Sequence, residues 1–221
     1  MEILNTYTTL MLIQSLRFCL KMTSYRGNRR SSLEIIMDIL KTCSSGASIS
    51  QILRESNLNY RQVQKYINFM VKKKLIKEIV IKSRKKFYTT KYGNSVLVAY
   101  NGLNEIINSN NFEKFPQVKH FSTTIVHTLA VKELGPQISK YEIYAKIISA
   151  SLKGITKTKL LYTLKTNTPW LNRHLKELIG KKMITEEKIY GDKRVKGLYR
   201  ATNKGKYYLK KYAELKSLFK H

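Results

Sequence analysis

The side chains in this sequence that are best suited to chemistry are cations and amides, and they gather between residues 59 and 86. Arginine, lysine, glutamine and asparagine hydrogen-bond base edges and phosphate oxygens, so this mixture is typical of a nucleic-acid contact. We predict that one group enters a groove of the nucleic acid: Tyr60, Arg61, Gln62, Gln64, Lys65 and Asn68. A second group is predicted to contact phosphates or to place a wing in the minor groove: Lys72, Lys73, Lys74, Arg84, Lys85 and Lys86.

Some of these residues also have a purely structural interpretation. Tyr60 and Tyr66 can be partly buried, and for Tyr66 this interpretation is the stronger one. Lys72, Lys73 and Lys74 can form a solvated helix end, where the helix dipole favours positive charge. Both interpretations of the lysines stay open at this point.

The spacing of apolar residues predicts the elements that hold these side chains. Asn59 is a suitable N-cap, and Val63, Ile67 and Met70 follow at helical spacing. Around Ile79 the spacing of the apolar residues changes to every second residue, which is typical of a strand. We expect residues 83–86 to turn the chain and residues 87–90 to return it, which is the pattern of a recognition helix followed by a basic wing.

Two shorter helices are predicted before this stretch. Ser32 is placed to cap the first, which ends near Gly46, and Ser48 is placed to cap the second. The order helix, helix, turn, helix, hairpin is that of a winged helix-turn-helix domain. The predicted fold class is therefore mainly α with small β-hairpins (α+β).

The same pattern recurs 108 residues later, so that Asn59 corresponds to Asn167. Each copy ends in a Thr-x-x-Gly motif and a long helix whose apolar residues step by four, three and four, the spacing of paired helices. The sequence predicts tandem winged helices whose C-terminal helices either pair within one chain, as a pseudo-dimer, or pair across a homodimer. A third interpretation, in which each helix covers only its own domain, is less favoured.

In the second copy the predicted contacts are Trp170, Asn172, Arg173 and Lys176 in the helix and Lys193, Arg194 and Lys196 in the wing. Trp170 corresponds to Gln62, a position expected to be exposed. An exposed Trp indicates a contact with DNA, RNA bases or a protein, and burial against the linker is an equal alternative. Nearby acidic residues dilute the charge, so we expect this copy to bind DNA more weakly.

The expected domains are a leader at 1–30, a winged-helix domain at 31–108, a linker at 109–139 with a helix between Ser122 and Leu134, and a second winged-helix domain at 140–221. The leader is interpreted as a disordered tail or basic arm. Met22 is a candidate for the biological start, in which case residues 1–21 are not translated.

Charge narrows the class of partner. Lysine and arginine total 42 against 14 acidic residues, a formal net charge of +28 and a pI near 10.1. Such an excess favours an acidic polymer, because each cation docked on a phosphate releases condensed counterions. Charge that serves only solubility is the weaker explanation.

Other function classes lack support in the sequence. The two cysteines and four histidines are not at metal-ligand spacing, and neither a phosphate-binding Gly-rich loop nor a paired carboxylate is recognisable. No apolar run has the length of a membrane span. We therefore predict no enzyme activity, no cofactor, no metal, no small-molecule ligand and no membrane association, and a cytoplasmic, nucleoid-associated location.

Three segments together resemble a known family: SLEIIMDILKTCSSGASISQIL, LNYRQVQKYINFMVKKKLI and FYTTKYG. They are similar to the small archaeal winged-helix DNA-binding proteins with a C-terminal dimerisation helix, most of which are described as predicted transcriptional regulators or nucleoid proteins. The resemblance covers Ser31–Ile107 well and Tyr141–Phe219 more loosely. It implies duplex DNA binding by a dimer, with Thr90 capping the last helix and Gly93 allowing close packing. This chain departs from the family by fusing two units.

The interpretation that results is a protein that binds double-stranded DNA, most simply a transcriptional regulator. Three alternatives stay open: a nucleoid or chromatin architectural protein, a tandem winged-helix scaffold for protein–protein interaction, and an RNA-binding protein. A basic recognition helix argues against a scaffold, and the absence of an RNA-module signature argues against RNA.

Overall fold

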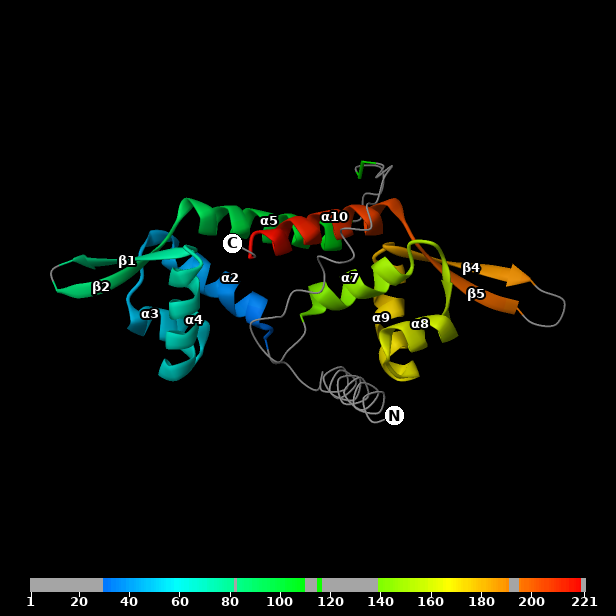
Figure 1. Cartoon of the computed structure of the whole chain (residues 1–221), viewed down its shortest axis with the longest axis horizontal. Coiled ribbons are helices and arrows are strands. Elements are labelled where there is room, and N and C mark those ends of the chain that lie inside the picture. The colour runs from blue at the N-terminus through cyan, green and yellow to red at the C-terminus, as the bar shows by residue number, and fades with distance from the viewer. Residues whose placement is uncertain (1–29, 82, 110–114, 117–138, 191–194, 220–221) are drawn as a thin grey trace, which may run out of the picture. The chain divides into compact units, whose positions relative to one another are not determined.

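The computed structural model describes residues 30–81, 83–109, 115–116, 139–190 and 195–219. These residues fall into two compact units, and each unit contains helices and a projecting β-hairpin (Figure 1). The N-terminal unit holds residues 30–107 together with the chain from Lys211 onward, and the C-terminal unit holds the described residues between Asn108 and Lys210. The predicted leader and the predicted linker helix at 122–134 lie outside the described residues.

The N-terminal unit has the predicted winged-helix order. Its elements are α2 (Ser32–Thr42), η1 (Cys43–Ser45), α3 (Ile49–Ser56), α4 (Tyr60–Lys72), β1 (Ile76–Ile81), β2 (Arg84–Thr89) and α5 (Lys91–Asn108). None of the helices within the described residues is both long enough and apolar enough to cross a membrane.

Side-chain caps fix where these helices begin. Ser31, one residue earlier than predicted, caps α2 and forms a reciprocal capping box with Glu34. Ser48 caps α3 as predicted, by accepting from the backbone N–H of Gln51. Asn59 caps α4 as predicted. The prediction for α2 was off by one because adjacent serines offer the same cap chemistry.

The core of this unit is the set of apolar residues that the helical spacing predicted. Val63, Ile67 and Met70 of α4 are all buried. They share the interior with other fully buried side chains, which include Ile36, Ile39, Leu40, Ile52, Leu75 and Phe87. Burial of one stripe of α4 leaves its other faces to solvent, which is the arrangement a recognition helix requires.

The wing of this unit is an antiparallel hairpin with a shorter turn than predicted. Its register pairs Ile79 with Lys86, Val80 with Lys85 and Ile81 with Arg84. Residues 84–86 therefore belong to strand β2, so the prediction that residues 83–86 form the turn was wrong. A run of cations looks like a loop in sequence, but lysine and arginine are tolerated in a strand whose faces are exposed.

The C-terminal unit repeats this architecture with one addition. Its elements are α7 (Lys140–Ala150), β3 (Ile155–Thr156), α8 (Lys157–Leu164), α9 (Thr168–Gly180), β4 (Ile184–Tyr190), β5 (Val195–Ala201) and α10 (Asn203–Ser217). Strand β3 pairs with β5 to make a three-stranded sheet. In the N-terminal unit the same position is a single bridge between Ala47 and Phe87. Neither pairing was predicted, because one or two residues show no alternation.

The backbone confirms the duplication independently of side-chain identity. Three pairs of residues with positive φ recur 108 positions apart: Gly46 and Gly154, Asn57 and Lys165, Lys74 and Lys182. Non-glycine residues adopt this conformation rarely. Its repetition at three matched turns shows that the two copies turn their chains in the same way.

The first Thr-x-x-Gly motif has the roles that the family resemblance implied. The Thr90 hydroxyl accepts from the Gly93 backbone N–H at 3.0 Å and donates to the Leu75 carbonyl at 3.1 Å. A Cβ on Gly93 would lie 2.2 Å from that carbonyl oxygen, so only glycine allows the close approach. Thr202 and Gly205 repeat both features in the C-terminal unit. The two motifs therefore dock α5 and α10 against their wings.

The second residue of each C-terminal helix also makes a long-range hydrogen bond. In the N-terminal unit, the Tyr92 hydroxyl donates to the carbonyl of Leu218, which follows the last residue of α10. In the C-terminal unit, the Lys204 ammonium donates to the carbonyl of Ser109, which follows the last residue of α5, at 2.7 Å. Each unit thus incorporates the end of a helix that begins in the other half of the sequence.

Candidate nucleic-acid interface

The solvent side of α4 carries most of the predicted groove contacts. Arg61, Gln62, Lys65 and Asn68 are exposed, and Tyr60 is 59% exposed. The helix contains no acidic residue, so nothing within it offsets its positive charge. A helix face that carries cations and no acids attracts a phosphate backbone.

Local hydrogen bonds separate the residues of this face into two classes. The Gln62 side chain accepts from the Asn59 backbone N–H at 3.3 Å and so completes the capping box. The amide of Gln64, which is half-buried, donates to the Tyr60 hydroxyl at 3.0 Å. Both glutamines therefore stabilise the start of the helix. The exposed side chains of Arg61, Lys65 and Asn68 are better placed to reach a ligand.

Tyr66 has the structural role that the sequence favoured. It is half-buried, and its hydroxyl donates to the Ser32 hydroxyl of α2 at 3.3 Å. This contact ties the recognition helix to the first helix of the unit.

The basic end of α4 fits both interpretations left open by the sequence. Lys72 is exposed in the last turn, where it interacts favourably with the helix dipole. Lys73 is the half-buried C-cap, and Lys74 is exposed with φ at +56°. These lysines can stabilise the helix end and contact phosphates at the same time.

The wing presents its cations to solvent. Arg84, Lys85 and Lys86 are all exposed. Lys85 lies 2.7 Å from a carboxylate oxygen of Glu78, and this hydrogen bond and charge raise the pKa of Lys85. An exposed ion pair contributes little to stability, but the negative charge of Glu78 offsets part of the positive charge that Lys85 presents to a ligand. Arg84 and Lys86 are therefore the stronger candidates for phosphate contacts.

In the C-terminal unit, three of the four predicted helix contacts are exposed on α9: Asn172, Arg173 and Lys176. Of the two alternatives left open for Trp170, the exposed one is excluded and burial is correct. Trp170 is only 7% exposed, and its ring meets the His174 ring edge-on with centroids 4.4 Å apart. An indole gains more from burial than a glutamine does, so it turns inward at this position. Trp170 is a core residue and is withdrawn as a DNA contact.

The contact with Trp170 places His174 in an apolar setting. Burial, reinforced by the nearby positive charge of Arg173, lowers the pKa of His174 to about 4, and Glu177 only partly opposes this effect. The imidazole is therefore neutral near neutral pH. It belongs to the core of this unit and is not a surface cation.

The second wing carries more negative charge than the first, because β4 contains two acidic residues, Glu186 and Glu187. The Tyr199 hydroxyl donates to Glu186 at 2.8 Å, and burial together with this bond raises the pKa of Tyr199 to about 12. Glu187 pairs with Arg200 at 3.4 Å. The predicted contacts Lys193 and Arg194, and the side chain of Lys196, lie outside the described part of the chain.

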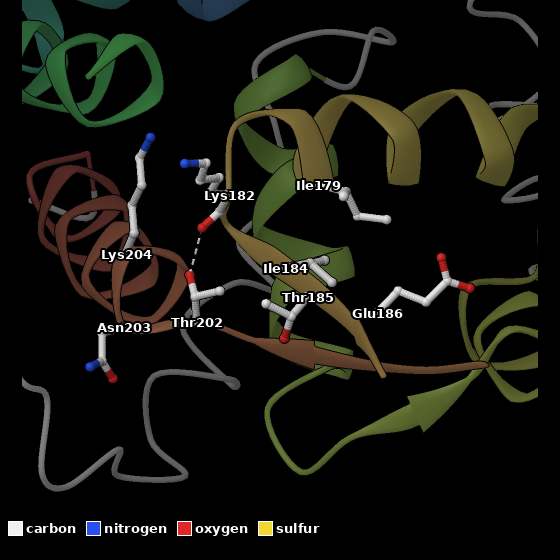
Figure 2. A pocket seen from close by; sticks show the side chains of 8 residues that line it. All are labelled: Ile179, Lys182, Ile184, Thr185, Glu186, Thr202, Asn203 and Lys204. Carbon is white, nitrogen blue, oxygen red and sulfur yellow. Dashed lines mark hydrogen bonds between the residues drawn. The ribbon is translucent and has the colours of Figure 1, made fainter. Parts of the chain in front are cut away.

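A hollow of about 550 Å³ lies between α9, β4 and the start of α10 (Figure 2). Ile179 and Ile184 line it together with Lys182, Thr202 and Lys204. The Lys204 ammonium is already hydrogen-bonded to the carbonyl oxygens of Ser109 and Lys181, at 2.7 and 2.9 Å. The Thr202 hydroxyl is likewise engaged with the Lys182 carbonyl. These polar groups hold the start of α10 in place, so the hollow is not a convincing ligand site.

The described residues offer little for catalysis. They contain no group of three or more His, Cys, Asp or Glu side chains placed to hold a metal ion. Cys43 is buried, and burial raises the pKa of its thiol to about 12, which leaves it a poor nucleophile. The site that the structure does build is a basic helix face beside a basic hairpin.

Comparisons with known proteins match both halves of the chain. A winged helix-turn-helix family model matches residues 29–108 and again residues 138–220. The uncharacterized protein MJ0287 of Methanocaldococcus jannaschii is 34% identical over 85 residues, which are 38% of this chain and 84% of that protein.

Two solved structures are also similar. Sso10a-2, a DNA-binding protein from Sulfolobus solfataricus, matches with 26% identity and a TM-score of 0.33 over 35% of this chain and 81% of its own. ScpB from Mycobacterium tuberculosis matches with 11% identity and a TM-score of 0.21 over 79% of this chain and 94% of its own. The family matches cover more than half of the sequence and agree with the fold of each unit. The chain belongs to the winged helix-turn-helix family.

Proposed function

We propose that this protein binds double-stranded DNA, with α4 in a groove and the β1–β2 wing on the adjacent backbone. The observation that carries the proposal is the combination of exposed Arg61 and Lys65 on an acid-free helix with exposed Arg84 and Lys86 on the neighbouring hairpin. Arginine and asparagine on such a face can read base edges, while lysines dock on phosphates. The role is one of binding and not of catalysis.

The two units contribute unequally in this proposal. Helix α9 contains Glu177, and β4 contains Glu186 and Glu187, whereas α4 has no acid and β1 has only Glu78. Phosphate contacts are opposed by carboxylates on the same surface. The N-terminal unit is therefore the stronger anchor, and the C-terminal unit adds weaker contacts through Arg173 and Lys176.

The biological role that fits best is transcriptional regulation, in which a helix in the major groove selects a sequence. An architectural nucleoid role is the second candidate, favoured by the net charge of +28, which attracts any duplex. Binding to one specific duplex more tightly than to random duplexes distinguishes the first role from the second.

We also infer that the protein acts as a monomer that pairs its own C-terminal helices. Within the N-terminal unit, Tyr92 near the start of α5 bonds to Leu218 just after α10. Within the C-terminal unit, Lys204 near the start of α10 bonds to Ser109 just after α5. These contacts are reciprocal within one chain, which supports the inference that the helices pair without a second chain. Light scattering after size-exclusion chromatography should give a mass near 25.8 kDa, and twice that mass would contradict the inference.

The test of DNA binding is fluorescence anisotropy with a labelled random duplex and the full chain. Arg61→Ala/Lys65→Ala should weaken binding strongly, because both side chains are exposed on α4. A matched control is Lys41→Ala/Lys210→Ala, which removes the same charge from exposed helix positions outside α4 and the wing. Equal losses in the two variants would show that charge alone, and not this helix, governs binding. A folded protein that does not bind at low salt would refute the proposal.

A further inference from the structure

The outer end of the first wing exposes aliphatic side chains beside its cations. Val80 is 61% exposed and Ile81 is 43% exposed, near the end of β1. Single exposed apolar residues are common on protein surfaces. Here, however, two stand next to each other on a projecting hairpin, and each lies directly opposite a cation, Lys85 for Val80 and Arg84 for Ile81. Cations attract an anionic ligand and exposed aliphatic side chains favour an apolar one, so this combination suits a ligand that has both kinds of surface.

The register of the hairpin separates these side chains onto two different faces. Successive residues of a strand point to opposite faces, and residues paired across two strands share a face. Val80 and Lys85 therefore share one face with Glu78, whose carboxylate lies 2.7 Å from the Lys85 ammonium. That face carries an internal ion pair, which reduces its attraction for an anion.

On the opposite face, none of the described residues of the hairpin is acidic. Ile81 lies there opposite Arg84, and Ile79 lies there opposite Lys86. Lys77 is on the same face and is exposed. This face thus consists of a short aliphatic strip, Ile79 and Ile81, bordered by cations that the register leaves without a carboxylate beside them.

Building on the DNA binding proposed above, we propose that Ile81 is an apolar wedge that the first wing inserts between base pairs in the minor groove, so that binding bends the duplex. The bordering cations hold the phosphates on either side of the groove. An aliphatic side chain gains free energy only where water is excluded, and the space between unstacked bases is such a place. Minor-groove proteins use wedges of this kind to kink duplexes by about 20–90°.

The second wing keeps an isoleucine, Ile189, 108 positions after Ile81, but it lacks the acid-free face of the first wing. The residue 108 positions after Ile79 is Glu187, and it pairs with Arg200 at 3.4 Å. An acidic residue there would repel the phosphates that border a minor groove. Bending is therefore assigned to the first wing alone.

The experiment measures bending separately from binding. A random duplex of about 30 base pairs carries a donor and an acceptor dye at its two ends, and its length is far below the persistence length of about 150 base pairs, so the free duplex is almost straight. The full-length chain is titrated onto it while anisotropy reports occupancy. At equal occupancy, the parent should raise energy transfer between the ends, and Ile81→Thr should lose most of that rise. Threonine keeps the β-branched shape that a strand favours, so the hairpin should stay folded.

Val80→Thr is the matched control, because Val80 is the more exposed of the two residues but lies on the face that bears Glu78. It should bend the duplex as the parent does. Undiminished bending by Ile81→Thr, or equal losses in both variants, would overturn the proposal, and the first of these outcomes would point to a protein partner for the strip. Binding by the parent without any bending would also overturn it while leaving the proposed function intact. Failure to bind at all would instead refute the proposed function.

Discussion

The wing offers a prediction whose size can be worked out from the structure. Arg84 and Lys86 are exposed, and within the described residues neither forms an ion pair. If each neutralises one phosphate, each contributes about 0.9 to the slope of log affinity against log salt concentration. Arg84→Ala/Lys86→Ala should therefore reduce the magnitude of that slope by about 1.8. Between about 50 and 200 mM salt, the parent should lose about 12-fold more affinity than the variant does.

The assay is anisotropy with the same random duplex at a series of salt concentrations. Lys41→Ala/Lys210→Ala serves again as the control with equal loss of charge, and its slope should stay close to that of the parent. Circular dichroism confirms that each variant is folded. A wing variant with the slope of the parent would refute the reasoning, because it would show that neither side chain displaces counterions from DNA.

Four further predictions concern the first wing, the core of the C-terminal unit and helix α5. Glu78→Gln should strengthen DNA binding severalfold in the same assay, because it removes a carboxylate and releases the charge of Lys85; weaker binding would contradict this. His174 has a folded-state pKa of about 4, below its ordinary 6.5, so the unfolded state binds more protons between these values and stability falls as pH falls from about 6.5 to 4. Thermal unfolding of His174→Phe should depend less on pH in this window, and an unchanged pH dependence would contradict the assignment. Gly93→Ala should lower the free energy of unfolding by about 1–3 kcal/mol or more, since its Cβ would meet a carbonyl oxygen at 2.2 Å. Gly102→Ala in the same helix has no atom within 4 Å of its Cβ and should raise the free energy of unfolding by about 1 kcal/mol, as measured in denaturant titrations.

The sequence predicted the helices and the duplication well because both depend on features with a period. Val63, Ile67 and Met70 repeat at helical spacing and are all buried. The roles that the family resemblance implied for Thr90 and Gly93 are also correct: the hydroxyl caps the start of α5, and the glycine allows its close approach to a carbonyl.

Trp170 shows where mapping one copy onto the other fails. Equivalent positions share a backbone conformation, but the burial of a side chain at the edge of a stripe depends on its own apolar surface. A signal was available: Trp170, His174 and Leu178 step by four and are all buried. The residue of the first copy that corresponds to Trp170 is the exposed Gln62, so comparison with the first copy did not indicate that the buried stripe of α9 is wider than that of α4.

The sequence predicted that a hairpin is present, but it did not predict which residues of its two strands pair with each other. The sequence placed the turn at residues 83–86 because clustered cations resemble a loop, whereas cross-strand pairing places three of them in β2. Which face each side chain occupies depends on that register, and a shift of one residue exchanges the faces. For this reason the acid-free face with Ile81 became visible only in the structure.

The central claim is that α4 and the first wing contact duplex DNA, and lysine acetylation footprinting tests it most directly. The full-length protein is acetylated with and without saturating duplex, and mass spectrometry measures the modification of each lysine. We predict that Lys65, Lys72 and Lys86 are protected by DNA while Lys41 and Lys210, which are also exposed in the free protein, stay reactive. Protection of Lys41 or Lys210 with Lys65 and Lys86 still reactive would contradict the claim, because the DNA would then lie on a different surface.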